Sequence, residues 1–290
     1  ARIGMKIENR RLRRPAVKGD HHNHRDRDRA SARAAAPMLA LNMKTTKNYD
    51  LDKYLKKHLI EGWSSGPSFL QSLDSWRKRS AKSSYATDGA ESCRTTALTY
   101  FARVQHAAHH FRAVALSDIK GFGFVWYDSF ATSSCVNHPD WQFEACCVLF
   151  NAAAALSFEG TSEDRGDPDG MRRACLAFQQ AAGTVSHLRD LVKDSTWTER
   201  TVDLSSEFLE AFETLMLAQA QKCFYEKAAA EGKSDAILTK VSAETAALYE
   251  DVAVKMRTPR LEKGCVARSL REWVHPSIQT KDRDPSAPGV

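Results

Sequence analysis

Across most of the second half of this chain, apolar residues recur three or four positions apart, which is the spacing of helices with one buried face. Four helices are predicted there, with these starts: at Trp141, at Met171, after a capping Ser205 or Ser206, and after Ser234. A polar stretch at 161–170 separates the first two. Helices of about 20 residues with short connections favour antiparallel pairs stacked as a TPR-like solenoid, although no strict repeat of about 34 residues is found.

The preceding part of the chain mixes helical and strand patterns. Tyr49–Glu61 and residues 90–113 have a helical period. Met38–Met43 alternates weakly between apolar and polar positions, and Phe122–Tyr127 has the aromatic and β-branched composition of a strand. The sequence therefore predicts a mostly α fold: a curved, TPR-like helical solenoid with a small β-sheet near the N-terminal part of the domain.

Composition changes at both ends. Residues 1–37 contain 11 Lys and Arg against 4 Asp and Glu, with few apolar residues, so they are predicted to be a disordered basic extension. Residues 38–275 are predicted to form the domain, and residues 276–290 a disordered tail. Because the whole chain carries +6, residues 38–290 carry a net −1. The domain thus lacks the basic footprint of nucleic-acid binding, and no nucleic acid is expected as a partner.

The arginine run at 10–14 leaves open a weak contact of residues 1–37 with an anionic membrane. Deleting residues 1–37 should then abolish salt-sensitive binding to liposomes. No apolar run approaches the roughly 18 residues of a membrane span, and the start lacks the apolar core of a secretion signal. The seven cysteines have no regular spacing and are interpreted as reduced thiols of a cytoplasmic protein.

Residues that could carry chemistry are few. His106, His109 and His110 lie at helical spacing, so that two of them could bind one metal ion, but a third ligand, a zinc-protease motif and a ligand-spaced cysteine pair are missing from the sequence pattern. Asp128 and Glu144 have no visible partner. Phosphate-binding and nucleophile motifs are not found either. The prediction is a protein that is not an enzyme and has no cofactor; a metal-dependent enzyme built on the three histidines remains an alternative.

A binding face is the stronger candidate. Ile237 and Val241 are four residues apart and therefore share one side of their helix, while Leu238 and Leu248 are predicted to fill the core. Phe224 belongs to the preceding antiparallel helix. Phe224, Ile237 and Val241 could form a shallow groove for an amphipathic helix. Ordinary packing between the two helices explains the same pattern, and periodicity alone favours that explanation.

Four segments in consistent order resemble the Bro-one domain family of Alix-type endosomal adaptors: Phe124–Phe130, Glu144–Asn151, Phe178–Gly183 and Leu215–Gln221. The start at Met38 resembles that of the family, and the similarity covers about residues 38–257, with a weak continuation to Glu272–Val274. The resemblance implies a curved helical solenoid. It also implies a non-enzymatic adaptor in the cytoplasm, recruited to endosomes, that binds the C-terminal amphipathic helix of a Snf-seven-type ESCRT-III subunit.

The family's binding patch aligns with Phe224, Ile237 and Val241, and this agreement favours the groove over plain packing. Val241 is smaller than the leucine of the family, which should cost about 0.8 kcal/mol of burial. An acidic family position falls on Pro168, beside Asp167 and Asp169. Same-fold signalling scaffolds, of the rhophilin or pH-signalling kind, remain alternatives because they use the same domain.

The pattern is lost near residue 257, before the length typical of the family. The domain is therefore expected to be C-terminally incomplete, with an exposed apolar end and marginal stability. A cooperative thermal melt together with a monomeric scattering mass would count against this expectation.

Overall fold

A computed structural model describes residues 38–48, 50–58 and 63–262, all of which belong to one compact unit, Pro37–Val290. The predicted basic extension at 1–37, the predicted tail at 276–290 and Glu272–Val274 lie outside the described residues, as does part of the helix predicted at Tyr49–Glu61.

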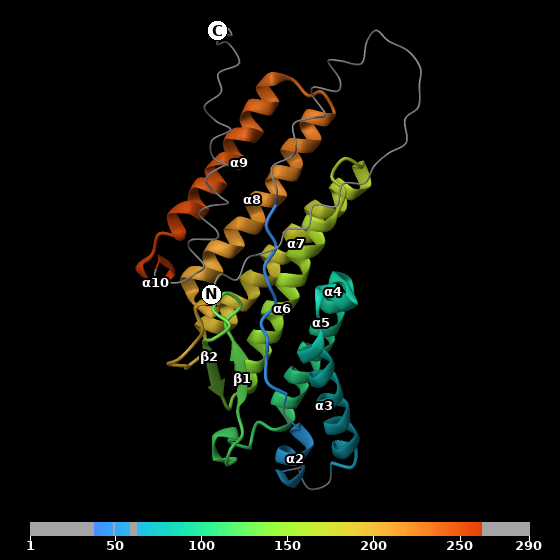
Figure 1. The fold of residues 1–290 in the computed structure, drawn as a ribbon, viewed down its shortest axis with the longest axis vertical. Coiled ribbons are helices and arrows are strands. Elements are labelled where there is room, and N and C mark those ends of the chain that lie inside the picture. Colours follow the sequence, from blue (N-terminus) through green and yellow to red (C-terminus); the bar gives the residue numbers. More distant parts are fainter. Residues whose placement is uncertain (1–37, 49, 59–62, 263–290) are drawn as a thin grey trace. The chain divides into compact units, whose positions relative to one another are not determined.

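Helices dominate the described part of the chain (Figure 1). The α-helices are α2 (Leu51–Leu55), α3 (Gly66–Lys82), α4 (Tyr85–Asp88), α5 (Ala90–His110), α6 (Trp141–Ser162), α7 (Pro168–Lys193), α8 (Ser206–Ala230), α9 (Asp235–Lys255) and α10 (Pro259–Glu262). Short 3-10 turns lie at Lys56–His58, Leu116–Asp118 and Val202–Leu204. The strands are β1 (Phe124–Tyr127) and β2 (Cys135–His138).

The long helices α5 to α9 pack in sequence order, each against the next, with short connections between α6 and α7 and between α8 and α9. This is the stacked arrangement of a helical solenoid, with one small antiparallel sheet, β1–β2, beside it. The predicted fold class, a mostly α TPR-like solenoid with a small sheet, is confirmed. The strand predicted at Phe122–Tyr127 is found at Phe124–Tyr127, and β2, which pairs with it, was not predicted.

Helix α6 is the centre of the core. The Asp140 carboxylate caps it by accepting a hydrogen bond from the Gln142 amide, 2.9 Å away. Almost every residue of α6 is buried, as expected for a helix that is apolar on all sides. Its length and composition would let it cross a membrane, but 89% of that apolar window is buried inside the protein, where α5 and α7 cover it.

Local sequence signals set the helix starts. Asp167 caps α7 by accepting from the Gly170 amide, and Pro168 follows at the first helical position, where its missing N–H costs nothing. Ser205, one of the two predicted caps, accepts from the Phe208 amide at the start of α8. Gly232 has φ +64° in the turn after α8, a conformation that favours glycine.

The strand predicted at Met38–Met43 is wrong. Residues 38–47, named here the N-terminal strap, form no strand; only Thr46 makes an isolated bridge, to Trp126. Helix side chains bind the backbone of the strap instead. Asn151 of α6 accepts from the Lys44 amide (2.6 Å) and donates to the Lys44 carbonyl (3.0 Å), and Gln219 of α8 binds Leu39 in the same two-way manner. These amides satisfy the backbone groups that a neighbouring strand would otherwise satisfy.

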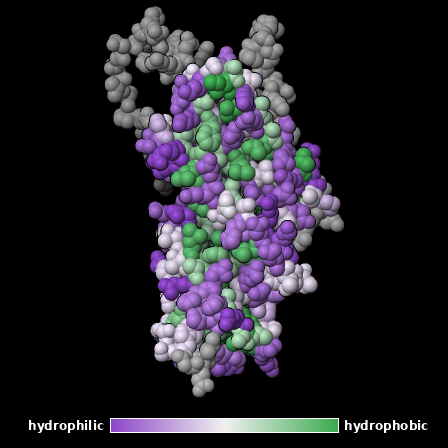
Figure 2. Space-filling model, turned by 180° about the vertical axis from the view of Figure 1, so that it is seen from behind, coloured by the Kyte–Doolittle hydropathy of each residue, from purple (hydrophilic) through white to green (hydrophobic). Residues whose placement is uncertain are grey.

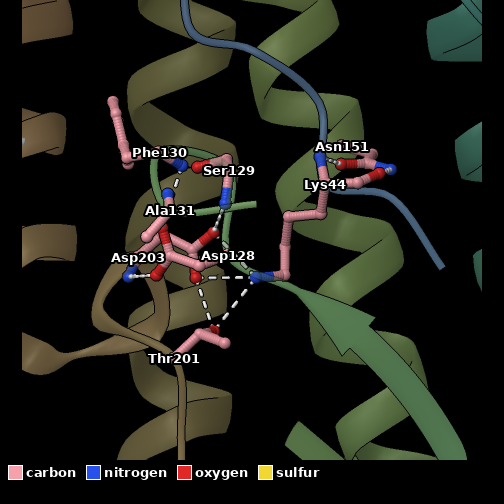
Figure 3. Close-up of polar contacts among 8 residues, drawn as sticks. All are labelled: Lys44, Asp128, Ser129, Phe130, Ala131, Asn151, Thr201 and Asp203. Carbon is pink, nitrogen blue, oxygen red and sulfur yellow. Dashed lines mark hydrogen bonds and ion pairs between the residues drawn. The ribbon is translucent and has the colours of Figure 1, made fainter. Parts of the chain in front are cut away.

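A buried ion pair anchors the strap (Figure 3). The Lys44 Nζ lies 2.6 Å from Asp203 Oδ1, and both side chains are fully buried. Asp203 also accepts from the Ser129 amide (2.7 Å), while the Asp203 amide donates to Asp128 (3.2 Å). The network joins the strap, the β1–β2 turn and the loop before α8, so Asp128 has a structural partner that the sequence did not reveal.

Glu144 lies in a second buried network. It accepts hydrogen bonds from the Tyr100 hydroxyl (2.8 Å) and the Trp126 indole, and the Arg77 Nε lies 3.1 Å from its carboxylate. Burial and the neighbouring carboxylate raise the pKa of Tyr100 well above its ordinary value, so the phenol stays a donor. The carboxylate is thus held by structural contacts from three elements, rather than standing free for catalysis.

Candidate protein-binding site

Helices α8 and α9 form an antiparallel hairpin whose register is fixed by side-chain contacts. The Gln221 amide donates to the Glu244 carboxylate (3.1 Å), and the Lys255 Nζ lies 3.4 Å from Glu210 Oε1. In each pair the two residues are equally far in sequence from the connecting turn. The same register places Phe224 of α8 at the level of Val241 of α9.

The three predicted site residues are not sealed in the core. Phe224 is 48% exposed and Ile237 is 47% exposed, while Val241 is half-buried. Ile237 precedes Val241 by one helical turn, so it lies on the same side of α9, nearer the connecting turn. Internal packing therefore leaves Phe224 and Ile237 accessible to solvent and Val241 partly so. Their role in binding stays a prediction.

The inward face of α9 differs in part from the predicted one. Val252 is buried and Leu248 packs against the core, but Leu238 is only half-buried and does not belong to the core. The buried positions of α9 are Thr245, Tyr249 and Val252, and Met256, which directly follows the helix, is also buried. Two overlapping sets of positions on α9 have a helical period. Packing against α8 buries the set that includes Tyr249.

Two further apolar residues extend the surface, and the sequence did not single them out. Leu217, two turns before Phe224 on the same side of α8, is 42% exposed, and Leu176 of α7 is 46% exposed. The Cys175 thiol donates to the Ala220 carbonyl (3.8 Å), so α7 reaches α8 between Leu217 and Phe224.

We keep the predicted term and use the name α7–α9 groove for this set of apolar residues, of which four are exposed and Val241 is half-buried: Leu176, Leu217, Phe224, Ile237 and Val241. Among the described residues, six large hydrophobic side chains are exposed, and four of them belong to this groove. A concentration of this kind is typical of an interaction surface, whereas single exposed apolar residues are normal. Figure 2, the view from behind Figure 1, shows hydrophobic residues exposed in separate patches among hydrophilic ones.

Charges of both signs border the groove. Lys227 and Glu231 form an exposed pair at the end of α8, and Arg172 pairs with Asp169 on the first turn of α7 (3.7 Å). Such a polar rim is usual around an apolar interface. Pro168 itself offers no polar side chain. The carboxylate of Asp167 is occupied by capping and that of Asp169 pairs with Arg172, so a polar contact at this position stays a prediction.

The histidines of α5 do not assemble a three-ligand site. His106 Nε2 and His110 Nε2 lie 2.8 Å apart, while Trp63 stacks on His110 with ring centroids 4.2 Å apart. No group of three His, Cys, Asp or Glu side chains suited to a metal ion is present in residues 38–48, 50–58 and 63–262. The alternative of a metal-dependent enzyme therefore lacks its third ligand within the described part of the chain.

Comparison with known proteins decides the family. The model of the BRO1-like domain matches residues 38–282. This chain belongs to the BRO1-like domain family. A relative, the vacuolar-sorting protein BRO1 of Arabidopsis thaliana, is 30% identical over 228 residues, which cover 77% of this chain and 27% of that protein.

Other relatives of this BRO1-like chain differ in their named roles. The pH-response regulator palA/RIM20 of Emericella nidulans is 37% identical over 134 residues, 45% of this chain and 16% of that protein. Among solved structures, the ALIX BRO1 CHMP4C complex is similar with a TM-score of 0.72 and 23% identity, covering 84% of this chain and 70% of that chain. The structural likeness shows the same fold. The chain spans about a quarter or less of the length of these two curated relatives.

Proposed function

We propose that this BRO1-like chain is a non-enzymatic adaptor that binds the C-terminal amphipathic helix of a Snf-seven-type ESCRT-III subunit, in the cytoplasm and at endosomes. The observation that carries the proposal is the α7–α9 groove, with Phe224 and Ile237 each about half exposed on adjacent helices. The similar ALIX BRO1 structure was solved with CHMP4C, which supports a partner of this class. The Arabidopsis relative is named for vacuolar sorting, which supports the cellular setting.

The spacing of these apolar residues suits a helix. Its apolar residues come from three neighbouring helices, and those on α8 are two turns apart, about 10 Å along the helix axis. An incoming helix with apolar residues at i, i+3, i+4 and i+7 presents a stripe of matching length. Phe224 would be the aromatic anchor of the interface, while Ile237 and Val241 would line the side formed by α9.

Ile237→Asp tests the assigned groove. The substitution places a carboxylate where the docked helix would remove it from water, so affinity for the C-terminal helix of a Snf-seven-type subunit should fall by at least about 2 kcal/mol, roughly 30-fold. Fluorescence anisotropy with the labelled peptide measures it. Val254→Asp is the matched control, because Val254 is 62% exposed on the same helix but outside the groove, and it should bind like the parent. Equal binding by parent and Ile237→Asp would reject the site.

A pH-signalling scaffold is the second candidate, favoured by the 37% identity to palA/RIM20. Such a protein would share the fold and differ in the partner. A rhophilin-like scaffold would instead bind a GTP-loaded Rho protein. Pull-downs with a panel of ESCRT-III tails and GTP-loaded Rho proteins separate the ESCRT-III role from the rhophilin-like one: retention of Rho protein without any ESCRT-III tail would exclude the first proposal.

A further inference from the structure

A second groove lies between α5 and α7, separate from the residues of the α7–α9 groove. It has a volume of about 430 Å³ and is open to solvent. Leu149 and Leu156 of α6 form its floor, and Leu98 of α5 and Gly183 of α7 stand on its two sides. We call it the α5–α7 groove. Leu98 is 39% exposed, although the floor residues are nearly buried.

Gly183 is the unexpected residue in this groove. It lies in the middle of the 26-residue helix α7, where glycine destabilises a helix relative to alanine. Its backbone is not left-handed, and a Cβ atom built on it meets no heavy atom within 4 Å. The fold therefore does not require glycine at this position. What the missing side chain provides is open space above the backbone of α7, opposite Leu98.

The ionisable residues that line the groove are basic. Arg94 and His187 lie on opposite walls, and none of the described residues that line the groove is acidic. Arg94 uses Nε to bind Glu159 (2.8 Å), which leaves the two terminal amino groups of its guanidinium without a partner among the described residues. Carboxylates on a bound molecule would complement this arginine.

The geometry selects a helix as the occupant. The floor leucines are two helical turns apart, and both walls are long helices, so the groove matches the contact length of an amphipathic helix. The β1–β2 sheet does not contribute to the lining, so an added strand would find no backbone partner there. A single arginine is too little to hold a lipid surface, for which clusters of basic residues are usual.

We propose that the α5–α7 groove is a second docking site, for an amphipathic helix of a partner protein that places a large apolar side chain over Gly183 and acidic residues beside Arg94 and His187. This site does not depend on the function proposed for the α7–α9 groove. The domain would then have two docking sites, each formed by three consecutive helices.

A displayed library of helix-forming peptides, with variable apolar positions and both acidic and basic flanks, provides the probe. The bait is the full chain carrying Ile237→Asp, which disables the α7–α9 groove, and the counter-bait carries Gly183→Phe in addition. We expect selected peptides to be acidic and to bind the first bait at least tenfold more tightly than the counter-bait by fluorescence anisotropy. Gly183→Ala should have a smaller effect, and Arg94→Gln should weaken binding and its dependence on salt.

Thermal melts separate blocking from unfolding. Gly183→Phe and Gly183→Ala should melt no lower than the parent, because each replaces glycine inside a helix and extends into open space. Failure to enrich any peptide that distinguishes the two baits overturns the proposal, and so does enrichment of basic peptides. Concentration-dependent dimers of the parent that Gly183→Phe abolishes would also overturn it, since the occupant would then be a second copy of this chain.

Discussion

The pair of histidines at His106 and His110 illustrates how single residues in this protein depend on their neighbours. The two Nε2 atoms are 2.8 Å apart, and the His110 ring lies flat against Trp63. Desolvation, followed by His106 and His109, lowers the pKa of His110 below its usual 6.5. A lowered histidine pKa means that the folded state binds this proton less tightly than the unfolded state. The free energy of unfolding therefore decreases as the pH falls below the unfolded-state pKa.

Titration of the histidines by NMR checks this assignment. In the parent, the pKa of His110 should be below 6.5. His106→Ala should raise it towards the ordinary value, since the positive charge of His106 opposes protonation of His110. His109→Ala is the matched control and should raise it less, because its ring centroid is 5.8 Å from that of His110, compared with 4.5 Å for His106. An unchanged His110 pKa in the His106 variant would contradict the coupling.

At this residue scale, sequence reasoning identified which residues carry chemistry but not what holds them. Helical spacing correctly placed His106 and His110 on one face of a helix. For Glu144 it found no partner, because Tyr100, Trp126 and Arg77 come from three other elements. Leu176 and Leu217 were missed for the opposite reason: a leucine in a helical pattern is normally a core residue, and the sequence does not reveal which leucines remain exposed.

Helices were predicted well where signals in their own sequence, rather than contacts with distant residues, determine the structure. The starts of α6 and α8 agree with the prediction, because apolar period and capping residues are local signals. Helix α7 begins at Pro168, three residues before the predicted Met171, because Asp167 caps it inside the predicted polar loop. The N-terminal strap was assigned to a strand because an extended segment and a strand share the same alternation. Its actual partners are side-chain amides of α6 and α8, which lie more than 100 positions away. Strand periodicity cannot show a partner that is itself a helix.

The strap makes a prediction at the scale of elements. In Asn151→Leu, the buried amide and carbonyl of Lys44 lose both hydrogen bonds, so the free energy of unfolding should fall by about 2–4 kcal/mol. Urea unfolding measures the loss, and faster hydrogen exchange at the Lys44 amide locates it. Gln179→Leu, at an exposed amide of α7, is the control and should stay within about 0.5 kcal/mol of the parent. Protection of Lys44 as in the parent would show that the strap does not depend on Asn151.

The whole molecule is held together by contacts that no local pattern contains. Lys44 and Asp203 are 159 positions apart, and their ion pair connects the strap to the loop that precedes α8 (Figure 3). The helical solenoid itself is stabilised by contacts between neighbouring helices, since each long helix packs on the next. The strap connects α6 and α8, which are not neighbours in the stack, so the strap and its ion pair should make unfolding of the domain more cooperative than stacked helices alone would be.

Lys44→Met tests whether the buried ion pair makes unfolding of the domain cooperative. Without the ammonium group, Asp203 keeps the Ser129 amide and the Thr201 hydroxyl as donors but loses its counter-charge in a fully buried site. Breaking one side of a buried pair typically costs about 3–5 kcal/mol, so the urea midpoint should fall strongly and the transition should broaden or split if the strap detaches first. Lys44→Met with Asp203→Leu removes both charges and should recover part of the loss.

Lys227→Met, at an exposed pair with Glu231, is the control and should leave the urea midpoint nearly unchanged. A Lys44→Met protein with the parent's urea midpoint would mean that the buried pair contributes nothing to the stability of the domain.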